Sequence, residues 1–255
     1  MQDLVILTGA SRGLGLAMAR ELIAPGRPLL CLSRQTRPEL SELAKARGAT
    51  VLQWSVDLAD PAPVAKRLHL WLSQLDAPSL AGATLINNAG VIPEIRSLEH
   101  CPPEGIAQAL RVGLEAPMLL TAAFLNASGA WVDAGWRGLR KVLNISSGLG
   151  RRPMAAQASY CAAKAGMDHF SRCVALEEAK RPHGASIVSL APGVIDTDMQ
   201  VQLRAGDPAD FPDLGRFQQL KALGQLSSPE QAASQVLAFL RHPRFGMEAV
   251  ADVRG

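Results

Sequence analysis

Three side chains in the sequence have the types and spacing needed to deliver a proton to a carbonyl oxygen. Tyr160 is the only tyrosine in the chain, and Lys164 follows it by four residues, so both would lie on one face of a helix. A free phenol has a pKa of about 10, and a nearby ammonium favours the phenolate and lowers that pKa. Ser147 lies thirteen residues before Tyr160. We therefore predict that Tyr160 is a general acid assisted by Lys164, and that the Ser147 hydroxyl binds the substrate oxygen.

A glycine-rich turn near the start of the chain is typical of a dinucleotide site. Residues 8–15 read TGASRGLG, between an expected strand and an expected helix. Glycines let the backbone approach a pyrophosphate, and the N–H groups of the following helix favour its negative charge. The placement matters, because a glycine-rich turn alone is weak support. The residues predicted to bind cofactor here are Gly9, Ser11, Arg12, Gly13, Leu14 and Gly15.

The residues after the second expected strand favour NADP over NAD. An acid at this place would bind the ribose 2′-hydroxyl of NAD, but Ser33 and Arg34 stand there and the first carboxylate is Glu39. Arg12 and Arg34 could both donate to a 2′-phosphate, because guanidinium offers a planar set of donors. The alternative is that the two arginines are only solvated surface residues.

Short apolar runs alternate with helical patterns along the chain. Strands are expected at residues 4–7, 29–32, 50–56, 83–86, 141–145 and 186–190, and helices at 14–24, 38–47, 61–75, 103–126 and 157–180. Continuous apolar strands indicate a parallel sheet that is covered on both faces. We predict one α/β domain over residues 1–255, a Rossmann-type doubly wound parallel sheet of about seven strands with helices on both faces. Residues 196–223 do not follow this alternation of strands and helices, and they are predicted to form a substrate-binding loop or lid.

Composition argues against several other classes of protein. Hydrophobic residues make up 48% and charged residues 19%, and the net charge is +3, so we expect a packed core and no nucleic-acid partner. The uncharged stretch at residues 116–132 is interrupted by polar residues and predicts a buried helix, not a membrane span. No signal peptide is recognised. The four cysteines lack disulfide or metal-ligand spacing, so we predict a cytoplasmic protein with reduced thiols and no metal.

Taken together, these motifs resemble the short-chain dehydrogenase/reductase family over nearly the whole chain. Besides the turn and the Ser147, Tyr160 and Lys164 set, the resemblance rests on Asp57, on NNAG at 87–90 and on the Pro-Gly pair at 192–193. It implies that Asp57 contacts the adenine, that Lys164 also binds the nicotinamide ribose, and that residues 192–197 contact the nicotinamide. The remaining residues predicted to bind cofactor are Ser33, Arg34, Asp57, Leu58, Asn88, Ala89, Gly90, Tyr160, Lys164, Pro192, Gly193, Val194, Ile195 and Thr197.

Gly113 departs from the family pattern. The family usually has an asparagine at this place, in the helix after the fourth strand, where it supports a proton relay. Here either the relay is lost or a water bonded to exposed backbone replaces the side chain. Glycine weakens a helix by about 1 kcal/mol, so a local kink is expected. On this basis Gly113→Asn would be neutral or mildly helpful.

The C-terminal half is similar to sepiapterin reductases and bacterial benzil reductases. The similar segments are ALEE at 175–178, APGVIDTDMQ at 191–200 and LKA at 220–222. The resemblance implies an NADPH-dependent reductase of a small ketone or dicarbonyl, and a homodimer or homotetramer that uses the long helix and the one before it. It also implies these substrate-binding residues: Ser147, Leu149, Tyr160, Gly193, Met199 and Asp252.

Two other functions stay open from the sequence. An acyl-carrier-protein ketoreductase would have a basic surface near the mouth of the pocket. A regulator that senses NADPH without turnover is favoured only by Gly113, whereas the intact serine, tyrosine and lysine argue against it.

Asp252 distinguishes substrate classes within the leading hypothesis. It lies close to the C-terminus, where sepiapterin reductases anchor the amino-bearing ring of the pterin with an aspartate. A carboxylate could bind such a ring with charge-assisted hydrogen bonds. The alternative is that Asp252 caps a final edge strand or pairs with Arg254.

Overall fold

The seven strands within the part of the chain that the structure describes form one parallel sheet. The computed structural model describes residues 2–254, and its strands lie side by side in the order β3-β2-β1-β4-β5-β6-β7. Each neighbouring pair is parallel. The strands are β1 (Gln2–Thr8), β2 (Leu29–Ser33), β3 (Val51–Ser55), β4 (Leu80–Asn87), β5 (Leu139–Ile145), β6 (Ser186–Ala191) and β7 (Val250–Asp252). The predicted doubly wound fold is confirmed.

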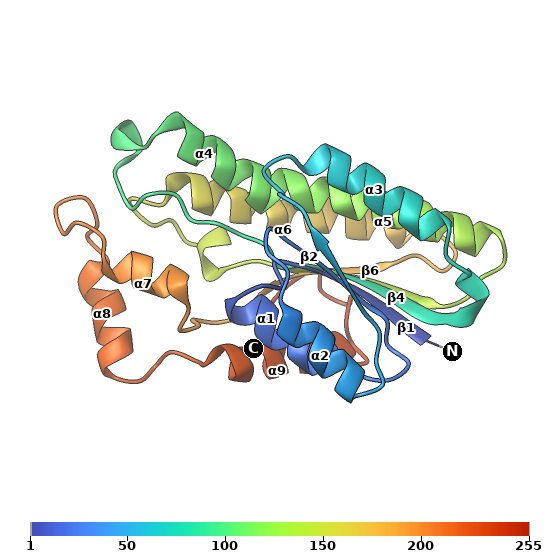
Figure 1. Cartoon of the computed structure of the whole chain (residues 1–255). Helices are drawn as coiled ribbons and strands as arrows, with labels where there is room; N and C mark the ends of the chain where they lie inside the picture. The colour runs from blue at the N-terminus through green and yellow to red at the C-terminus, as the bar shows by residue number, and fades with distance from the viewer. Residues whose placement is uncertain (1, 255) are drawn as a thin grey trace.

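Helices cover both faces of this sheet, as Figure 1 shows. One face is covered by α1 (Gly13–Leu22), α2 (Pro38–Ala46) and α9 (Pro229–Arg241). The other is covered by α3 (Pro61–Ser73), α5 (Ala116–Asp133) and α6 (Ala158–Glu178), and α4 (Pro103–Leu110) packs against α6. None of the helices in residues 2–254 is both long enough and apolar enough to cross a membrane.

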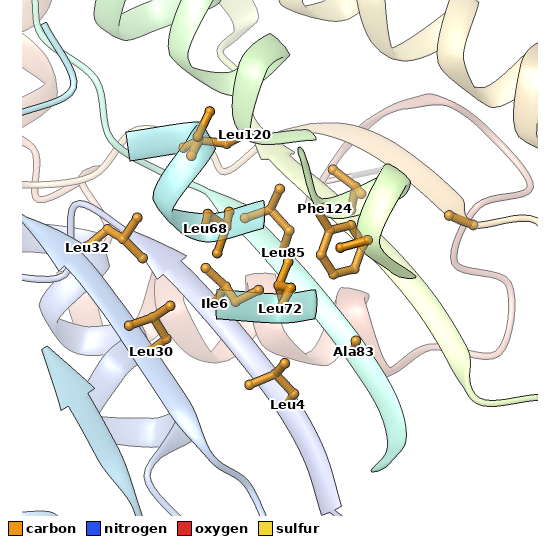
Figure 2. Close-up of a cluster of buried hydrophobic side chains, with 14 of the residues drawn as sticks. Leu4, Ile6, Leu30, Leu32, Leu68, Leu72, Ala83, Leu85, Leu120 and Phe124 are labelled. Atoms are coloured by element: carbon orange, nitrogen blue, oxygen red, sulfur yellow. The ribbon is translucent and has the colours of Figure 1, made fainter. Parts of the chain in front are cut away.

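Alternate residues of the strands point to opposite faces of the sheet and belong to two separate apolar clusters. Leu4 and Ile6 of β1 face α3 and α5, whereas Val5 and Leu7 belong to the cluster on the side of α1 and α9. Figure 2 shows the first cluster, with Leu68 and Leu72 of α3 and Leu120 and Phe124 of α5 over the strands. Because both faces are buried, apolar residues occupy consecutive positions of the central strands, which explains the continuous apolar runs in the sequence.

The helix expected over residues 103–126 is divided by a wider turn. After α4 the chain forms a π-helical turn at Arg111–Glu115, and α5 then continues to Asp133. Gly113 lies in this turn, so the local irregularity expected there is present. Single π-turns inside helices are frequent at functional sites.

Two short helices extend beyond the carboxyl edge of the sheet. These are α7 (Asp198–Arg204) and α8 (Leu214–Ala222), at the left of Figure 1, and they fall within the segment predicted to be a lid. They have a small apolar cluster of their own, which consists of Ala156, Leu203, Phe211, Leu214 and Phe217. The segment is therefore held by its own core beside the sheet.

Candidate active site

One cavity at the carboxyl edge of the sheet brings the predicted residues together. Its volume is about 760 Å³. All of the predicted catalytic and cofactor-binding residues line it, and so do Leu149, Gly193 and Met199 of the predicted substrate set. Asp252 is the one predicted site residue that is not part of its wall. Strands β1, β4, β5 and β6 all end here, which is where parallel α/β sheets bind ligands.

The glycine-rich turn leaves a space that only glycine permits. Gly9 has a φ of 70°, and a Cβ atom there would lie 2.9 Å from Cα of Ala89. A Cβ atom at Gly15 would overlap the carbonyl oxygen of Gly9. The backbone is thus closely packed and exposed to the cavity where α1 begins, as the binding of a pyrophosphate requires.

Thr8 and Asn88 hold the ends of β1 and β4 at this turn. Thr8 Oγ1 accepts hydrogen bonds from the backbone N–H groups of Asn88 and Ala89, both at 2.9 Å. Asn88 Nδ2 in turn donates to the backbone oxygens of Thr8 and Gly9, at 3.0 and 3.3 Å. These bonds fix the turn against the end of β4.

The corner predicted to bind a 2′-phosphate contains three arginines. Arg12 and Arg34 line the cavity beside Ser33, and Arg12 Nη1 lies 3.2 Å from Oδ2 of Asp198 in α7. Both members of this pair are well exposed, at 60% and 74%, so it is a weak interaction. Sequence reasoning missed Arg37, whose Nε donates to the backbone oxygen of Ser11 at 2.6 Å. The residues of this corner fit NADP.

The three catalytic candidates converge from β5 and α6. Tyr160 and Lys164 are buried, at 8% and 4% exposed, and lie on one face of α6. Lys164 Nζ donates to the backbone oxygen of Ile145 at 2.8 Å and lies 5.7 Å from the centre of the Tyr160 ring. Ser147 lies two residues after the end of β5, accepts a hydrogen bond from the backbone N–H of Leu149 and is hydrogen-bonded to Tyr160. A carbonyl oxygen in the cavity could therefore meet two hydroxyl donors together.

Burial is the main influence on the pKa values of Tyr160 and Lys164. It raises the pKa of Tyr160 to about 12, and the hydrogen bond to Ser147 opposes this shift. It also lowers the pKa of Lys164 to about 8, an effect that the charge of Asp168 opposes. The structure therefore contradicts the expectation that Lys164 lowers the pKa of Tyr160, because desolvation of the phenolate outweighs other influences. Tyr160 is a protonated acid at neutral pH.

Asp168 is a buried group that sequence reasoning missed. It is 1% exposed, and its Oδ1 accepts hydrogen bonds from Ser146 and Ser189, both at 2.6 Å. Its Oδ2 is bonded by Arg151 Nε at 3.1 Å. Asp168 follows Lys164 by four residues on α6, a spacing that could have drawn attention to it. These bonds connect α6 to the ends of β5 and β6, next to Ser147.

Comparison with known proteins agrees with this geometry. The model of the short chain dehydrogenase family matches residues 3–208. The chain belongs to the short-chain dehydrogenase/reductase family. It is therefore an oxidoreductase of that family.

Two relatives are similar to this chain over nearly its whole length. The benzil reductase ((S)-benzoin forming) of Bacillus cereus is 36% identical over 242 residues, which is 94% of this chain and 95% of the relative. The sepiapterin reductase of Meriones unguiculatus is 34% identical over 258 residues, 97% of this chain and 94% of the relative. The resemblance to both groups is confirmed.

A solved structure supports the same fold. A protein assigned as a 2-deoxy-d-gluconate 3-dehydrogenase from Agrobacterium tumefaciens, with bound NADP, superposes with a TM-score of 0.77 at 25% identity. The match covers 98% of this chain and 94% of that one.

Gly113, where the family usually has asparagine, packs directly against the catalytic helix. A Cβ atom at Gly113 would lie 3.1 Å from Cβ of Ala163, which stands between Tyr160 and Lys164 on α6. Gly113 does not line the cavity, although Val112 and Gln108 of the same region do. The sequence predicts that Gly113→Asn is neutral. For this to hold, Ala163 would have to move by a few tenths of an ångström.

The carboxylate of Asp252 is bound by Arg254, and Asp252 does not line the cavity. Arg254 binds its two carboxylate oxygens through Nε and Nη2, at 2.8 and 2.6 Å. This bidentate bond lowers the pKa of Asp252. Arg254 is the member of the pair that lines the cavity. The structure matches the alternative reading of Asp252, a residue of the last strand that pairs with Arg254.

Proposed function

We propose that this chain is an NADPH-dependent carbonyl reductase that transfers a hydride to a ketone or dicarbonyl. The observation that carries the proposal is a single cavity lined by both the glycine-rich turn and the Ser147, Tyr160 and Lys164 set. The names of the two relatives support reduction of a carbonyl, and the cofactor would supply the hydride.

Each catalytic side chain has a distinct role in this proposal. The hydroxyl of Ser147 donates to the substrate oxygen and holds it beside Tyr160. Tyr160, which keeps its proton at neutral pH, transfers it to that oxygen as the carbonyl carbon accepts the hydride. Lys164 binds the cofactor ribose, and its charge favours the phenolate that this transfer leaves behind.

The experiment that tests this proposal is NADPH oxidation with benzil, sepiapterin and related diketones. Steady turnover of any of them supports the reductase. If the protein binds NADPH but reduces none, the function must be that of a sensor or of an enzyme for another substrate.

The preference for NADPH is tested at Arg34. Loss of a charge-assisted bond to the 2′-phosphate should cost about 1.5–3 kcal/mol, so Arg34→Ala should weaken NADPH far more than NADH. Arg244→Ala is a matched control, because Arg244 is exposed and outside the cavity wall. Equal use of NADPH and NADH by the unmutated protein would refute the preference.

One observation favours an acyl-carrier-protein ketoreductase as a second candidate. Arg152 and Arg216 are exposed and line the cavity, and this alternative would need a basic surface near the cavity mouth. Reduction of an acyl thioester with a kcat/KM above that of benzil would favour the alternative.

The remaining predictions concern the lid, the oligomeric state and the cellular location of the protein. We propose that residues 196–223 act as the substrate lid of a single domain, because α7 and α8 supply Met199, Leu203 and Phe217 to the cavity. We also propose a cytoplasmic homodimer or homotetramer whose interface includes α5 and α6. Large apolar side chains are exposed on both helices, Met118 at 40% and Leu176 at 69%. Sedimentation of Leu176→Asp as a smaller species than the unmutated protein would support this interface.

A further inference from the structure

A short segment after β5 carries Ser147 and lies against the side of α6. We call residues 146–151 the serine segment; it contains one short helical turn, Gly148–Gly150, directly after Ser147. In the proposed reaction the hydroxyls of Ser147 and Tyr160 reach the same substrate oxygen, so their separation has to be fixed. The contacts that hold the serine segment therefore bear on the reaction.

Both ends of the serine segment are bonded to one carboxylate. At its start, the Ser146 hydroxyl donates to Oδ1 of Asp168 at 2.6 Å. At its end, Arg151 Nε donates to Oδ2 of the same side chain at 3.1 Å. Each oxygen of Asp168 thus holds one end of the segment, and Ser147 lies between the two attachments.

The middle of the serine segment packs closely against the same part of α6. A Cβ atom at Gly150 would lie 3.0 Å from Oδ2 of Asp168 and 3.0 Å from the backbone oxygen of Lys164. Glycine permits so close an approach because it has no Cβ atom. The segment has little room to move toward α6, and its bonds to Asp168 oppose movement away from it.

The carboxylate of Asp168 is itself fixed among several elements. It is 1% exposed, and Ser189 of β6 donates to its Oδ1 at 2.6 Å. Arg151 also reaches β7, where its Nη2 donates to the backbone oxygen of Ala251 at 2.9 Å. Short hydrogen bonds to an ionised group are strong, and in a buried network they hold their partners in one arrangement. Asp168 therefore joins the serine segment to α6 and β6, and through Arg151 to β7.

Asp168 and Arg151 lie outside the cavity wall. Ser146 and Ser147 line the cavity, but Asp168 and Arg151 do not. Asp168 is four residues after Lys164 on α6, and this helix also carries Tyr160. Any influence of Asp168 on turnover is therefore indirect, and it passes either through the serine segment or through Lys164.

We propose that Asp168 is a positioning residue, which together with Arg151 fixes the distance between the hydroxyls of Ser147 and Tyr160. It acts through the serine segment and touches neither substrate nor cofactor. This inference rests on the proposed reductase function, because the two hydroxyls act as a pair only on a shared carbonyl oxygen. Loosening the segment should lower kcat and leave the affinity for NADPH unchanged.

The first test removes the attachment that lies outside the cavity wall. Arg151→Met frees one end of the serine segment, so kcat with benzil should fall by about tenfold or more, because small misplacements of reacting groups are costly. Arg181→Met is the matched control, since Arg181 Nε lies 3.4 Å from Oε1 of Glu178, another buried carboxylate of α6. Its kcat should stay close to that of the unmutated protein. An unchanged kcat in Arg151→Met would overturn the proposal.

A double variant separates the serine segment from Lys164. If Arg151 acts by placing Ser147, Arg151→Met should cost little further kcat in a Ser147→Ala background, where no hydroxyl remains to be placed. The same fold-loss in both backgrounds would show that Arg151 and Asp168 act through Lys164 or through the fold as a whole. That result would overturn the proposal even though Arg151→Met lowers kcat.

Hydrogen exchange in the ligand-free protein measures the position of the segment directly. The backbone N–H groups of Leu149 and Gly150 donate to Oγ and to the backbone oxygen of Ser147, at 3.1 and 3.0 Å. Exchange at these two amides should be faster in Ser146→Ala than in the unmutated protein. Ser189→Ala is the matched control, because it removes a hydroxyl from the same oxygen of Asp168 without touching the serine segment. Equal acceleration in both variants would overturn the proposal.

The exchange measurement also separates failure of this inference from failure of the proposed function. It needs no turnover, so it can be made even if the protein reduces no carbonyl compound. In that case the proposed reductase fails, whereas faster exchange in both Ser146→Ala and Arg151→Met still shows that Asp168 holds the serine segment. Unchanged exchange in both variants would overturn the role of Asp168 in a working reductase as well.

Discussion

The two ends of α6 bury charged side chains in opposite ways. Near its C-terminus Glu178 is paired directly with Arg140, Nη2 to Oε2 at 3.0 Å, and the two side chains are 3% and 2% exposed. Near its N-terminus Lys164 is equally buried, but in residues 2–254 its ammonium bonds only a backbone oxygen. The anion of that end, Asp168, is bonded by two serines and Arg151 instead of Lys164.

The partners at each end explain what each end does. Arg140 also donates to the backbone oxygen of His183, and Glu178 accepts from the backbone N–H of Ala185, so these groups fasten the loop before β6. Lys164 keeps donors free for a ligand, and burial lowers its pKa to about 8, although the charge of Asp168 opposes this shift. A buried pair that is bonded directly serves the fold, whereas a buried cation without such a bond is available to a ligand.

Removing the proton donor should give the largest effect. Tyr160→Phe should lower kcat by about 10²–10⁴-fold or to background, because general acid catalysis contributes on that scale. NADPH titration should show nearly unchanged cofactor binding, whereas Lys164→Ala should impair both binding and turnover. Near-normal turnover by Tyr160→Phe would refute the assigned chemistry.

Breaking the pair at the other end should instead affect stability. Arg140→Met removes the buried partner of Glu178 and leaves that carboxylate only the exposed Arg181, 3.4 Å away, so the free energy of unfolding should fall by up to about 3–5 kcal/mol. Urea denaturation measures this loss, and the double variant Arg140→Met with Glu178→Leu should recover part of it. A large loss of kcat in the folded single variant would show that the two ends are not separable in this way.

Ser147 should have an intermediate effect on the catalytic end alone. Ser147→Ala removes one of the two hydroxyls that meet the substrate oxygen, and kcat should fall by about 10²–10³-fold, as for other donors of this kind. The melting temperature should change little, because Ser147 makes only a local backbone contact besides its bond to Tyr160. A loss under about threefold would argue against its role.

The smallest expected effect is on the pH dependence of turnover, which should respond to a change near Lys164 but not to a change at the other end of α6. Reduction should decline as pH rises through the pKa of Lys164, about 8. Tyr160 and Asp168 on α6, the carbonyl of Ile145 on β5, and Arg151 bound to Asp168 are the charged and polar groups around it. Asp168 raises the pKa of Lys164, so Asp168→Asn should move this decline to lower pH. Glu178→Gln, at the distant end, should leave it in place.

The same titration predicts how stability depends on pH. The pKa of Lys164 is lower in the folded protein than its ordinary value of 10.5, so between about 8 and 10.5 the unfolded chain binds more protons. The contribution of Lys164 to the free energy of unfolding should therefore rise with pH across this window. Lys164→Met should remove this rise, and an unchanged pH dependence of the urea midpoint would contradict the assignment.

The sequence by itself determined the class of fold and the residues gathered around the cavity. Parallel strands that are covered on both faces are largely apolar, and a tyrosine and lysine four apart share a helical face. The glycine-rich turn could be placed because a strand and a helix flank it. These are local patterns, so they can be read without knowing how distant segments pack.

Only the tertiary structure decided the features that depend on distant segments. The last strand, Val250–Asp252, has just three residues and gains its place by pairing with β6. The raised pKa of Tyr160 and the lowered pKa of Lys164 come from burial beneath segments far apart in the chain.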